Sequence, residues 1–160
     1  MGELINILNT TYDKIERLKP PEILGIEEKT GEWMAEVLKE GEVNPVTKLR
    51  KNIDRYPLDS KYWVCDRAEF NKVVQWDWTD NKQYISEKYD CDNFAFSFKA
   101  RVDRRFHLNN VGLVIDWSGK HAYNLVVFKD GTWAAFEPQS DSWPSVGQGM
   151  YKFESKIVLL

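Results

Sequence analysis

The chain has 160 residues, of which 42% are hydrophobic and 29% are charged, and its formal net charge is −3. This length and balance predict one globular, soluble domain with an adequate core. The small negative charge provides no basic field to attract nucleic acid. We expect no membrane interaction, because no apolar run reaches the ~18 residues of a membrane span. No signal peptide is recognisable at the N-terminus, so we expect a cytoplasmic location.

Two cysteines and two histidines limit the chemistry that the chain can carry. Cys65 and Cys91 do not make a disulfide framework, and such a pattern suits a reducing compartment. With no CxxC spacing and only His107 and His121, we expect no metal site and no cofactor. Aromatic residues reach 14% and include seven Trp. This proportion favours an aromatic surface that either contacts ligand or packs the core.

The first part of the chain is predicted to be mainly helical. Apolar residues at helical spacing predict a helix over residues 3–18, which Pro20 and Pro21 end. A second helix is expected from Gly31 or Glu32 to Leu38. After these we expect a short helix over Val46–Ile53, a strand over Tyr62–Cys65, a helix over Ala68–Val74 and an aromatic loop over Gln75–Asp80.

The second part is predicted to contain one long helix and then a sheet. Asp90 is a good N-cap for a helix that starts at Cys91, and Asn109-Asn110 ends it. We expect strands over Val111–Trp117, His121–Lys129, Thr132–Phe136 and Ile157–Leu160, with a hairpin at Asp130-Gly131. The order predicts an α+β fold in which a nucleophile helix packs on an antiparallel sheet. We expect one domain over 1–160, with a mainly helical part over 1–60 and the catalytic helix and sheet over 84–160.

Cys91 is the candidate nucleophile. A thiol reacts as the thiolate, which a helix N-terminus and a neighbouring imidazolium both favour. The flanking Asp90 and Asp92 oppose the thiolate unless they point away or are offset. The alternative is a buried structural thiol, and that interpretation fits Cys65 better.

His121 is the candidate base and Glu137 the candidate orienting group. His107 lies 16 positions after Cys91, which is roughly 24 Å along a continuous helix, so it is too distant to be the partner. His121 and Glu137 flank a hairpin and should lie near each other across it. The alternatives are a surface hairpin histidine and an exposed carboxylate at a strand end. Asn124 would point to the opposite face of the strand, and Asp141 is the fallback orienter.

An oxyanion would need two donors, of which the backbone N–H of Cys91 is the first candidate. Gln83 is the side-chain candidate for the second donor. The alternatives for that donor are Gln75, Trp76, Trp78 and Tyr84. The aromatic residues that either line a substrate cleft or pack the core are Trp76, Trp78, Tyr84, Trp117, Trp133 and Trp143.

Three short motifs resemble those of the papain-like and transglutaminase-like superfamily of cysteine enzymes. They are Asp90-Cys91-Asp92-Asn93-Phe94-Ala95, His121-Ala122-Tyr123, and Phe136-Glu137-Pro138 after Asp130-Gly131-Thr132-Trp133. The resemblance covers roughly Tyr84 to Asp141, with Glu137 where Asp is usual. It implies a Cys-His-Glu set similar to that of the papain-like domain of a mushroom agglutinin. Gln83 lies eight residues before Cys91, which departs from the usual spacing of the oxyanion Gln.

The predicted function is therefore a cysteine-dependent amide hydrolase, either a peptidase or a cell-wall amidase, which acts through a thioester on a peptide or peptidoglycan-type substrate. Transglutaminase or deamidase chemistry uses the same residues and is the first alternative. The second alternative is a non-catalytic binding or structural module, with an aromatic surface that contacts carbohydrate. The sequence leaves the oligomeric state open.

Overall fold

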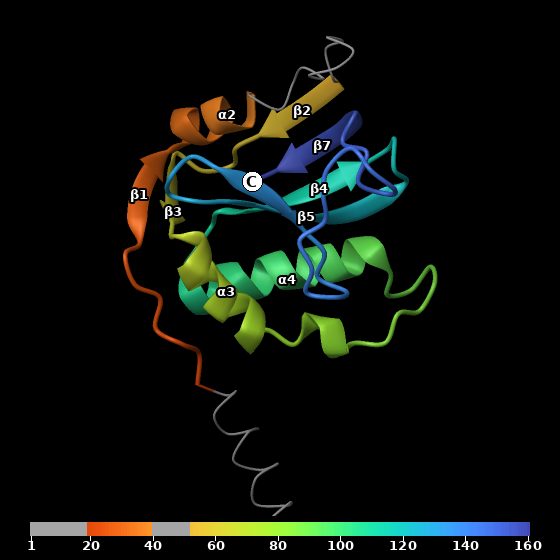
Figure 1. The fold of residues 1–160 in the computed structure, drawn as a ribbon, viewed down its shortest axis with the longest axis horizontal. Helices are drawn as coiled ribbons and strands as arrows, with labels where there is room; N and C mark the ends of the chain where they lie inside the picture. The colour runs from red at the N-terminus through yellow and green to blue at the C-terminus, as the bar shows by residue number, and fades with distance from the viewer. Residues whose placement is uncertain (1–18, 40–51) are drawn as a thin grey trace, which may run out of the picture.

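A five-stranded mixed sheet forms the centre of the protein (Figure 1). A computed structural model describes residues 19–39 and 52–160. In spatial order, the strands are β2 (Asn52–Tyr56), β7 (Ser155–Leu159), β4 (Val111–Asp116), β5 (His121–Val127) and β6 (Trp133–Phe136). The pairs are antiparallel except for β2 and β7, which are parallel. A parallel edge pair joins parts of the chain that lie about a hundred residues apart.

The hairpin between β4 and β5 fixes the position of His121. Asp116 is the register partner of His121, and the turn between them contains Gly119. A Cβ on Gly119 would lie 1.8 Å from the carbonyl oxygen of Met150, so the close approach of these two segments requires glycine. The Asp116 carboxylate also accepts a hydrogen bond from the Gly119 N–H at 2.9 Å. The turn is therefore set by local chemistry and by packing against the C-terminal segment.

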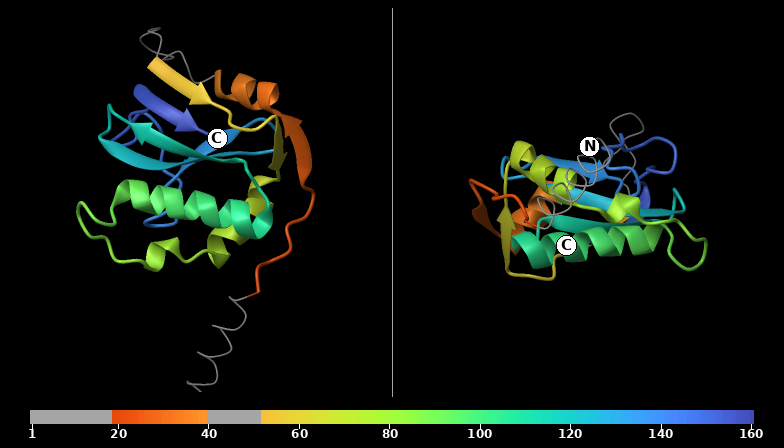
Figure 2. Two further views of the ribbon diagram at one scale, coloured as in Figure 1. Left: turned by 180° about the vertical axis from the view of Figure 1, so that it is seen from behind. Right: turned by 90° about the horizontal axis from the view of Figure 1, so that it is seen from below.

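The sheet is covered on both faces, which explains why all seven residues of β5 are buried. On one face, α4 (Cys91–Phe106) lies against β4 and β5, with α3 (Arg67–Trp76) beside it (Figures 1 and 2). On the other face lies α2 (Gly31–Lys39). Alternating residues of β5 therefore contribute to two cores. One core contains Met34, Leu38, Tyr123 and Leu125, and the other contains Phe70, Phe98, Val126 and Phe136.

A second, two-stranded sheet lies beside the main one. It pairs β1 (Glu27–Thr30) with β3 (Lys61–Val64) in antiparallel fashion. Burial alternates along β3, so that Tyr62 and Val64 face the core and Trp63 faces outward. A short 3₁₀ helix, η1 (Thr79–Asn81), contacts α4. None of the helices in the described ranges is long and apolar enough to cross a membrane.

Most of the predicted elements are confirmed. The helices expected near 31–38 and 68–74 are α2 and α3, and the helix that starts at Cys91 is α4. The strands expected at 62–65, 111–117, 121–129, 132–136 and 157–160 correspond to β3, β4, β5, β6 and β7. These elements carry strong local signals, namely an N-cap, tight turns and clear periodicity.

Two expectations about the sheet and the first part of the chain are wrong. Asn52 and Ile53 lie in β2 instead of a helix over Val46–Ile53, because β7 supplies a backbone partner for them. The main sheet is mixed and not purely antiparallel, for the same reason. The rest of that predicted helix, and the whole of the helix expected over 3–18, lie outside the described residues.

Candidate functional site

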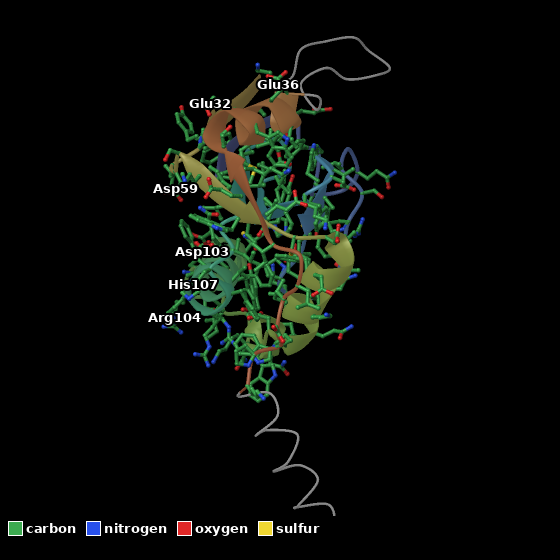
Figure 3. The ribbon with its side chains drawn as sticks, turned by 90° about the vertical axis from the view of Figure 1, so that its left-hand side faces the viewer. Glu32, Glu36, Asp59, Asp103, Arg104 and His107 are labelled. Carbon is green, nitrogen blue, oxygen red and sulfur yellow. The ribbon has the colours of Figure 1, made fainter. Side chains whose placement is uncertain are left out.

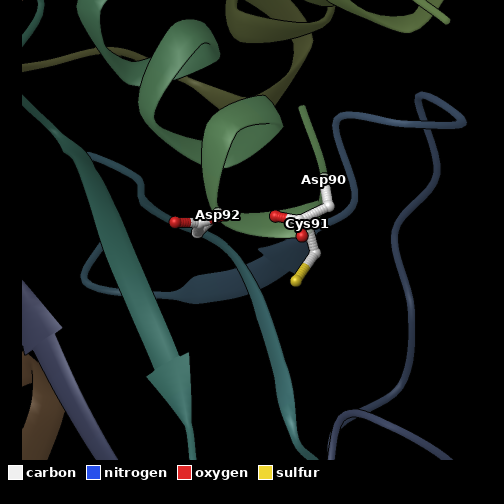
Figure 4. Close-up of side chains that lie close together, drawn as sticks. All are labelled: Asp90, Cys91 and Asp92. Carbon is white, nitrogen blue, oxygen red and sulfur yellow. The ribbon is translucent and has the colours of Figure 1, made fainter. Parts of the chain in front are cut away.

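Cys91 is the first residue of α4 and is half-buried and not disulfide-bonded (Figure 4). The turn before it is held by a capping box, in which the Asp90 N–H donates to the Asn93 side chain at 3.1 Å. The Asp90 carboxylate in turn accepts the Glu87 N–H at 3.1 Å. Figure 4 shows the sulfur directed away from the helix. The local sequence therefore places one thiol at the positive end of a helix dipole.

The acidic residues on either side of Cys91 interact with each other. One ligand-type atom from each of Asp90, Cys91 and Asp92 lies within 4.8 Å of the other two. A hydrogen bond with Asp90, and secondarily burial, raises the pKa of Asp92. The two carboxyl groups thus share hydrogen-bonding capacity, which reduces the negative charge that opposes a thiolate at this position.

His121 and Glu137 are in direct contact. The His121 Nε2 lies 2.7 Å from the Glu137 Oε2, and the two residues are 8% and 4% exposed. Glu137 also accepts hydrogen bonds from the Tyr151 hydroxyl at 2.8 Å and from the Gln139 N–H at 3.1 Å. Burial alone would raise the pKa of Glu137, but these hydrogen bonds outweigh it and lower that pKa. Glu137 is therefore an ionised carboxylate whose geometry fixes the imidazole.

Tyr151 is a member of this cluster that the sequence did not indicate. Its ring meets the His121 ring edge-on at 5.4 Å, while Tyr123 stacks on His121 at 5.8 Å. Burial, and then the hydrogen bond to Glu137, raise the pKa of the Tyr151 hydroxyl. Tyr151 follows the glycine-containing segment 147–149, whose loop composition gives no sign that the next residues turn back toward the sheet. Its role depends entirely on tertiary packing.

The other residues considered as orienters contact different groups. Asn124 is fully buried and donates to the carbonyl oxygens of Ala95 at 3.0 Å and Gly112 at 3.2 Å. Asp141 adopts a left-handed conformation with φ 49°. Burial, followed by repulsion from Asp80 and Asp77, raises the pKa of Asp141 to about 7.

The remaining cysteine, histidine and oxyanion candidates lie in distinct environments. Cys65 is fully buried, and burial raises the pKa of its thiol to about 12. His107 is the exposed C-cap of α4, at the opposite end of the helix from Cys91. Gln83 is exposed on the segment between η1 and α4.

The aromatic residues divide between core and surface. Trp143 packs against Phe70, Phe128 and Phe136, and Trp133 packs against Phe153. Trp76 meets Phe106 edge-on, with the guanidinium of Arg101 over its ring. By contrast, Trp117 is 60% exposed and Trp63 is 41% exposed. Trp63, which the sequence placed only within the strand expected over Tyr62–Cys65, is thus an exposed aromatic on a strand.

Trp63 borders a groove of about 420 Å³ between β3 and the C-terminal end of α4. The groove is lined by Ile26, Trp63, Asp103, Phe106, His107 and Asn109. Asn109 fixes its geometry, because its side chain accepts the Trp63 N–H at 2.8 Å and donates to the Lys61 carbonyl oxygen at 3.0 Å. Figure 3 shows Asp103 and His107 at the same edge of the molecule.

Comparison with known proteins assigns the family. The family model described as "Ricin-type beta-trefoil lectin C-terminal domain" matches residues 39–150, and the chain belongs to this family. Among solved structures, one described as "PSL1a-E64 complex" has a TM-score of 0.63 and 25% sequence identity. The match covers 83% of this chain and 50% of that one.

A second solved structure is the Polyporus squamosus lectin bound to the human-type influenza-binding epitope Neu5Aca2-6Galb1-4GlcNAc. It has a TM-score of 0.61 and 24% identity, and the match covers 83% of this chain and 49% of that one. The chain therefore spans about half the length of these structures. No curated protein matches the chain significantly.

These findings overturn the predicted fold family and the predicted activity. The assignment to the papain-like and transglutaminase-like superfamily is wrong, since the matching family is a lectin domain family and a structural neighbour is a lectin. The predictions of a cysteine hydrolase, of an acyl-transfer enzyme and of a peptide or peptidoglycan-type amide substrate are wrong on the same ground. The physical reason is that a thiol, an imidazole and a carboxylate in order along a chain form a local pattern, and such a pattern determines neither fold nor turnover.

Proposed function

We propose that this chain is a non-catalytic, carbohydrate-binding domain of a lectin, and that the groove beside Trp63 contacts the sugar. Membership of a lectin C-terminal domain family supports the carbohydrate as the ligand class. The observation that supports this most directly is the half-exposed Trp63 ring at the border of a groove that also contains Asp103 and His107. The backbone N–H of Trp63 donates to the Asn109 side chain.

The chemistry of this groove suits a sugar. A pyranose ring has an apolar face of C–H groups and a periphery of hydroxyls, so a binding site needs a flat apolar surface beside polar groups. Trp63 and Phe106 supply the apolar surface, and Asp103 and His107 supply an acceptor and an imidazole at its edge. Burial raises the pKa of Asp103, and one of its carboxylate oxygens pairs with the Lys99 ammonium at 3.3 Å. The other oxygen has no hydrogen-bond partner among the described residues, so it can accept a hydrogen bond from a sugar hydroxyl.

The backbone around Trp63 is held in place before any ligand binds. The Asn109 side-chain amide donates to the Asp59 carboxylate and to the Lys61 carbonyl oxygen, each at 3.0 Å. Its carbonyl oxygen accepts the Trp63 N–H. Three hydrogen bonds thus fix the outward-facing strand residue against the end of α4. A strand backbone that is already fixed loses less conformational entropy on binding.

The test is glycan binding by this chain itself, because the chain corresponds to about half of each structural neighbour. Isothermal titration with the trisaccharide Neu5Aca2-6Galb1-4GlcNAc and with its neutral disaccharide portion should give saturable binding to at least one of them. Trp63→Ala should weaken that binding by about tenfold or more, in line with the loss of a buried aromatic contact. Trp117→Ala removes another exposed indole and should leave affinity unchanged. The absence of binding to both glycans, or an equal loss in both variants, contradicts the proposal.

We further propose that Cys91, His121 and Glu137 act as one thiol–imidazole–carboxylate set, with the reactivity of the Cys91 thiol as its measurable property. The 2.7 Å contact between His121 and Glu137 and the position of Cys91 at the start of α4 support this proposal. Gln83, which is exposed on the segment between η1 and α4, stays a candidate hydrogen-bond donor to the set. A comparison of the rate of Cys91 alkylation in wild type and in His121→Ala tests this proposal.

Two broader expectations also remain proposals. The pairing of β2 with β7 supports a single domain over 1–160, since it joins two segments that lie far apart in the sequence into one sheet. The two free thiols, Cys65 and Cys91, support a reducing compartment such as the cytoplasm. A free-thiol assay on the protein as isolated from its natural source would test the second, since a structural disulfide would leave no thiol to titrate.

A further inference from the structure

A second pocket, separate from the Trp63 groove and from the His121 cluster, lies between η1 and the outer face of α4. Its volume is about 300 Å³. Its lining consists of Thr79, Lys82, Tyr89, Ser97, Ala100, Arg101 and Arg104. The volume is at the lower end of the roughly 300–1,000 Å³ that small-molecule sites occupy. The pocket thus has room for a ligand the size of a monosaccharide.

The helical wall of this pocket follows from residue spacing. Ser97, Ala100, Arg101 and Arg104 stand at positions i, i+3, i+4 and i+7 of α4, and therefore lie along one face. The small side chain of Ala100 leaves space between the serine and the two arginines. The opposite wall is the segment that carries Thr79 and Lys82.

The charge of the lining is positive. Lys82, Arg101 and Arg104 line the pocket, and no acidic residue does. The Arg101 Nε lies 2.7 Å from the Asp77 carboxylate, which is almost fully buried and so orients that guanidinium. Within residues 19–39 and 52–160, neither Lys82 nor Arg104 forms an ion pair. Two cations therefore remain uncompensated at the pocket.

The hydroxyl groups of the lining add neutral donors. Thr79 is only 2% exposed, and its hydroxyl has no hydrogen-bond partner among the described residues. A buried polar group without a hydrogen-bond partner destabilises the folded protein. The presence of such a hydroxyl at a pocket wall therefore points to a ligand that supplies the missing hydrogen bond. The Tyr89 hydroxyl donates to the Ser97 Oγ at 3.0 Å, which leaves the Ser97 O–H free to donate outward.

From this arrangement we infer an anion-binding site that takes the carboxylate, phosphate or sulfate group of a small acidic ligand, such as an acidic monosaccharide or a sugar ester. Arg104 and Lys82 supply the charge, and Thr79 and Ser97 supply hydroxyl donors to the oxyanion. Arginine suits planar or tetrahedral oxyanions because its fork of N–H groups can bind two oxygens at once. Carbohydrate binding at the Trp63 groove is not required for this site.

An amide-shift titration of ¹⁵N-labelled protein can test the site. The probes are inorganic phosphate, inorganic sulfate and N-acetylneuraminic acid, each compared with sodium chloride at equal ionic strength. We expect saturable shifts for amides in 79–82 and 97–104 with at least one probe. A response to N-acetylneuraminic acid alone identifies a carboxylate site, and a response to phosphate or sulfate identifies an ester site. The inference is overturned if none of the three probes shifts these amides, or if sodium chloride shifts them equally.

Variants make the test specific to these residues. Arg104→Ala should weaken binding by about tenfold, the usual range for a charge-assisted hydrogen bond. Lys82→Ala should also weaken it, and Lys152→Ala, which removes a charge from another exposed loop, should not. Thr79→Val should weaken binding while Thr79→Ser retains it; circular dichroism verifies the fold of the valine variant. Unchanged affinity in both Arg104→Ala and Lys82→Ala, or an equal loss in Lys152→Ala, overturns the inference.

Discussion

The imidazole of His121 at the start of β5 and the carboxylate of Glu137 just after β6 meet at 2.7 Å inside the protein. Glu137→Gln should lower the free energy of unfolding by about 2 kcal/mol at pH 7, because hydrogen bonds to a charged acceptor are among the stronger ones. An amide also offers a donor where Tyr151 and the Gln139 N–H need an acceptor. Urea denaturation at pH 7 measures the loss, and Glu154→Gln, at an exposed glutamate, is the matched control.

The pH dependence of this effect has a definite sign. The folded-state pKa of Glu137 is lowered, so its contribution is present above the unfolded value near 4.3 and is lost as pH falls through the folded value. The difference between wild type and Glu137→Gln should therefore shrink below about pH 4. A difference that is constant from pH 7 to pH 3 would show that the lowered pKa of Glu137 contributes nothing to stability.

Cys91 should react with iodoacetamide in the folded protein and Cys65 should not. Cys91 is half-buried at a helix start, whereas Cys65 is fully buried and burial raises its pKa to about 12. Mass spectrometry of peptides after brief labelling at pH 7.5 should find the modification at Cys91, with Cys65 modified only after unfolding in denaturant. Equal labelling of the two cysteines in the native protein contradicts the assignment.

A separate prediction is that the reactivity of the Cys91 thiol depends on His121. If the imidazole assists the thiol, His121→Ala should slow alkylation of Cys91 near neutral pH, while His107→Ala at the far end of α4 should not. The labelling rate is measured with native protein, and circular dichroism confirms that each variant is folded. Identical rates in wild type and His121→Ala would remove His121 from the proposed set.

Asp141→Asn should stabilise the protein at pH 8 by about 1–3 kcal/mol, with little effect at pH 4. Burial, then Asp80 and Asp77, raise the pKa of Asp141 to about 7, so the folded state favours the protonated form. Wild-type stability is therefore lost as pH rises from about 4 through 7. Asparagine tolerates the left-handed φ of 49° and carries no charge. Thermal unfolding at the two pH values checks this, and equal stability at pH 8 would contradict it.

Asn124→Ala should destabilise the protein by about 2–3 kcal/mol, because it removes two buried hydrogen bonds and leaves a small cavity. The side chain links β5 to the carbonyl oxygens of Ala95 in α4 and Gly112 in β4. Chemical denaturation measures the effect, and Asn81→Ala, at an exposed position, is the control. A loss as small as that of the control would show that the link between helix and sheet is not important for stability.

The family and the groove beside Trp63 lay beyond the reach of sequence reasoning, which offered a carbohydrate-contacting module only as its second alternative. Trp63 was an unremarkable neighbour of Cys65 in the sequence, and only the fold places it beside Asp103 and His107 from α4. The short motifs around Cys91, His121 and Glu137 favoured an enzyme superfamily, whereas the family match over 39–150 identifies a lectin domain. A motif of a few residues describes a local arrangement, and many folds can supply it.

By itself the sequence determined the elements whose signals are local. Asp90 and Asn93 place the start of α4 at Cys91, and the Asp130-Gly131 turn aligns β5 with β6, because caps and turns involve residues only a few positions apart. Only the tertiary structure decided that β2 pairs with β7, that Tyr151 reaches Glu137, and that Thr79 and Arg104 share a pocket. Those contacts join distant segments, and they form because the whole chain must bury both faces of one sheet, a constraint that no short stretch of sequence contains.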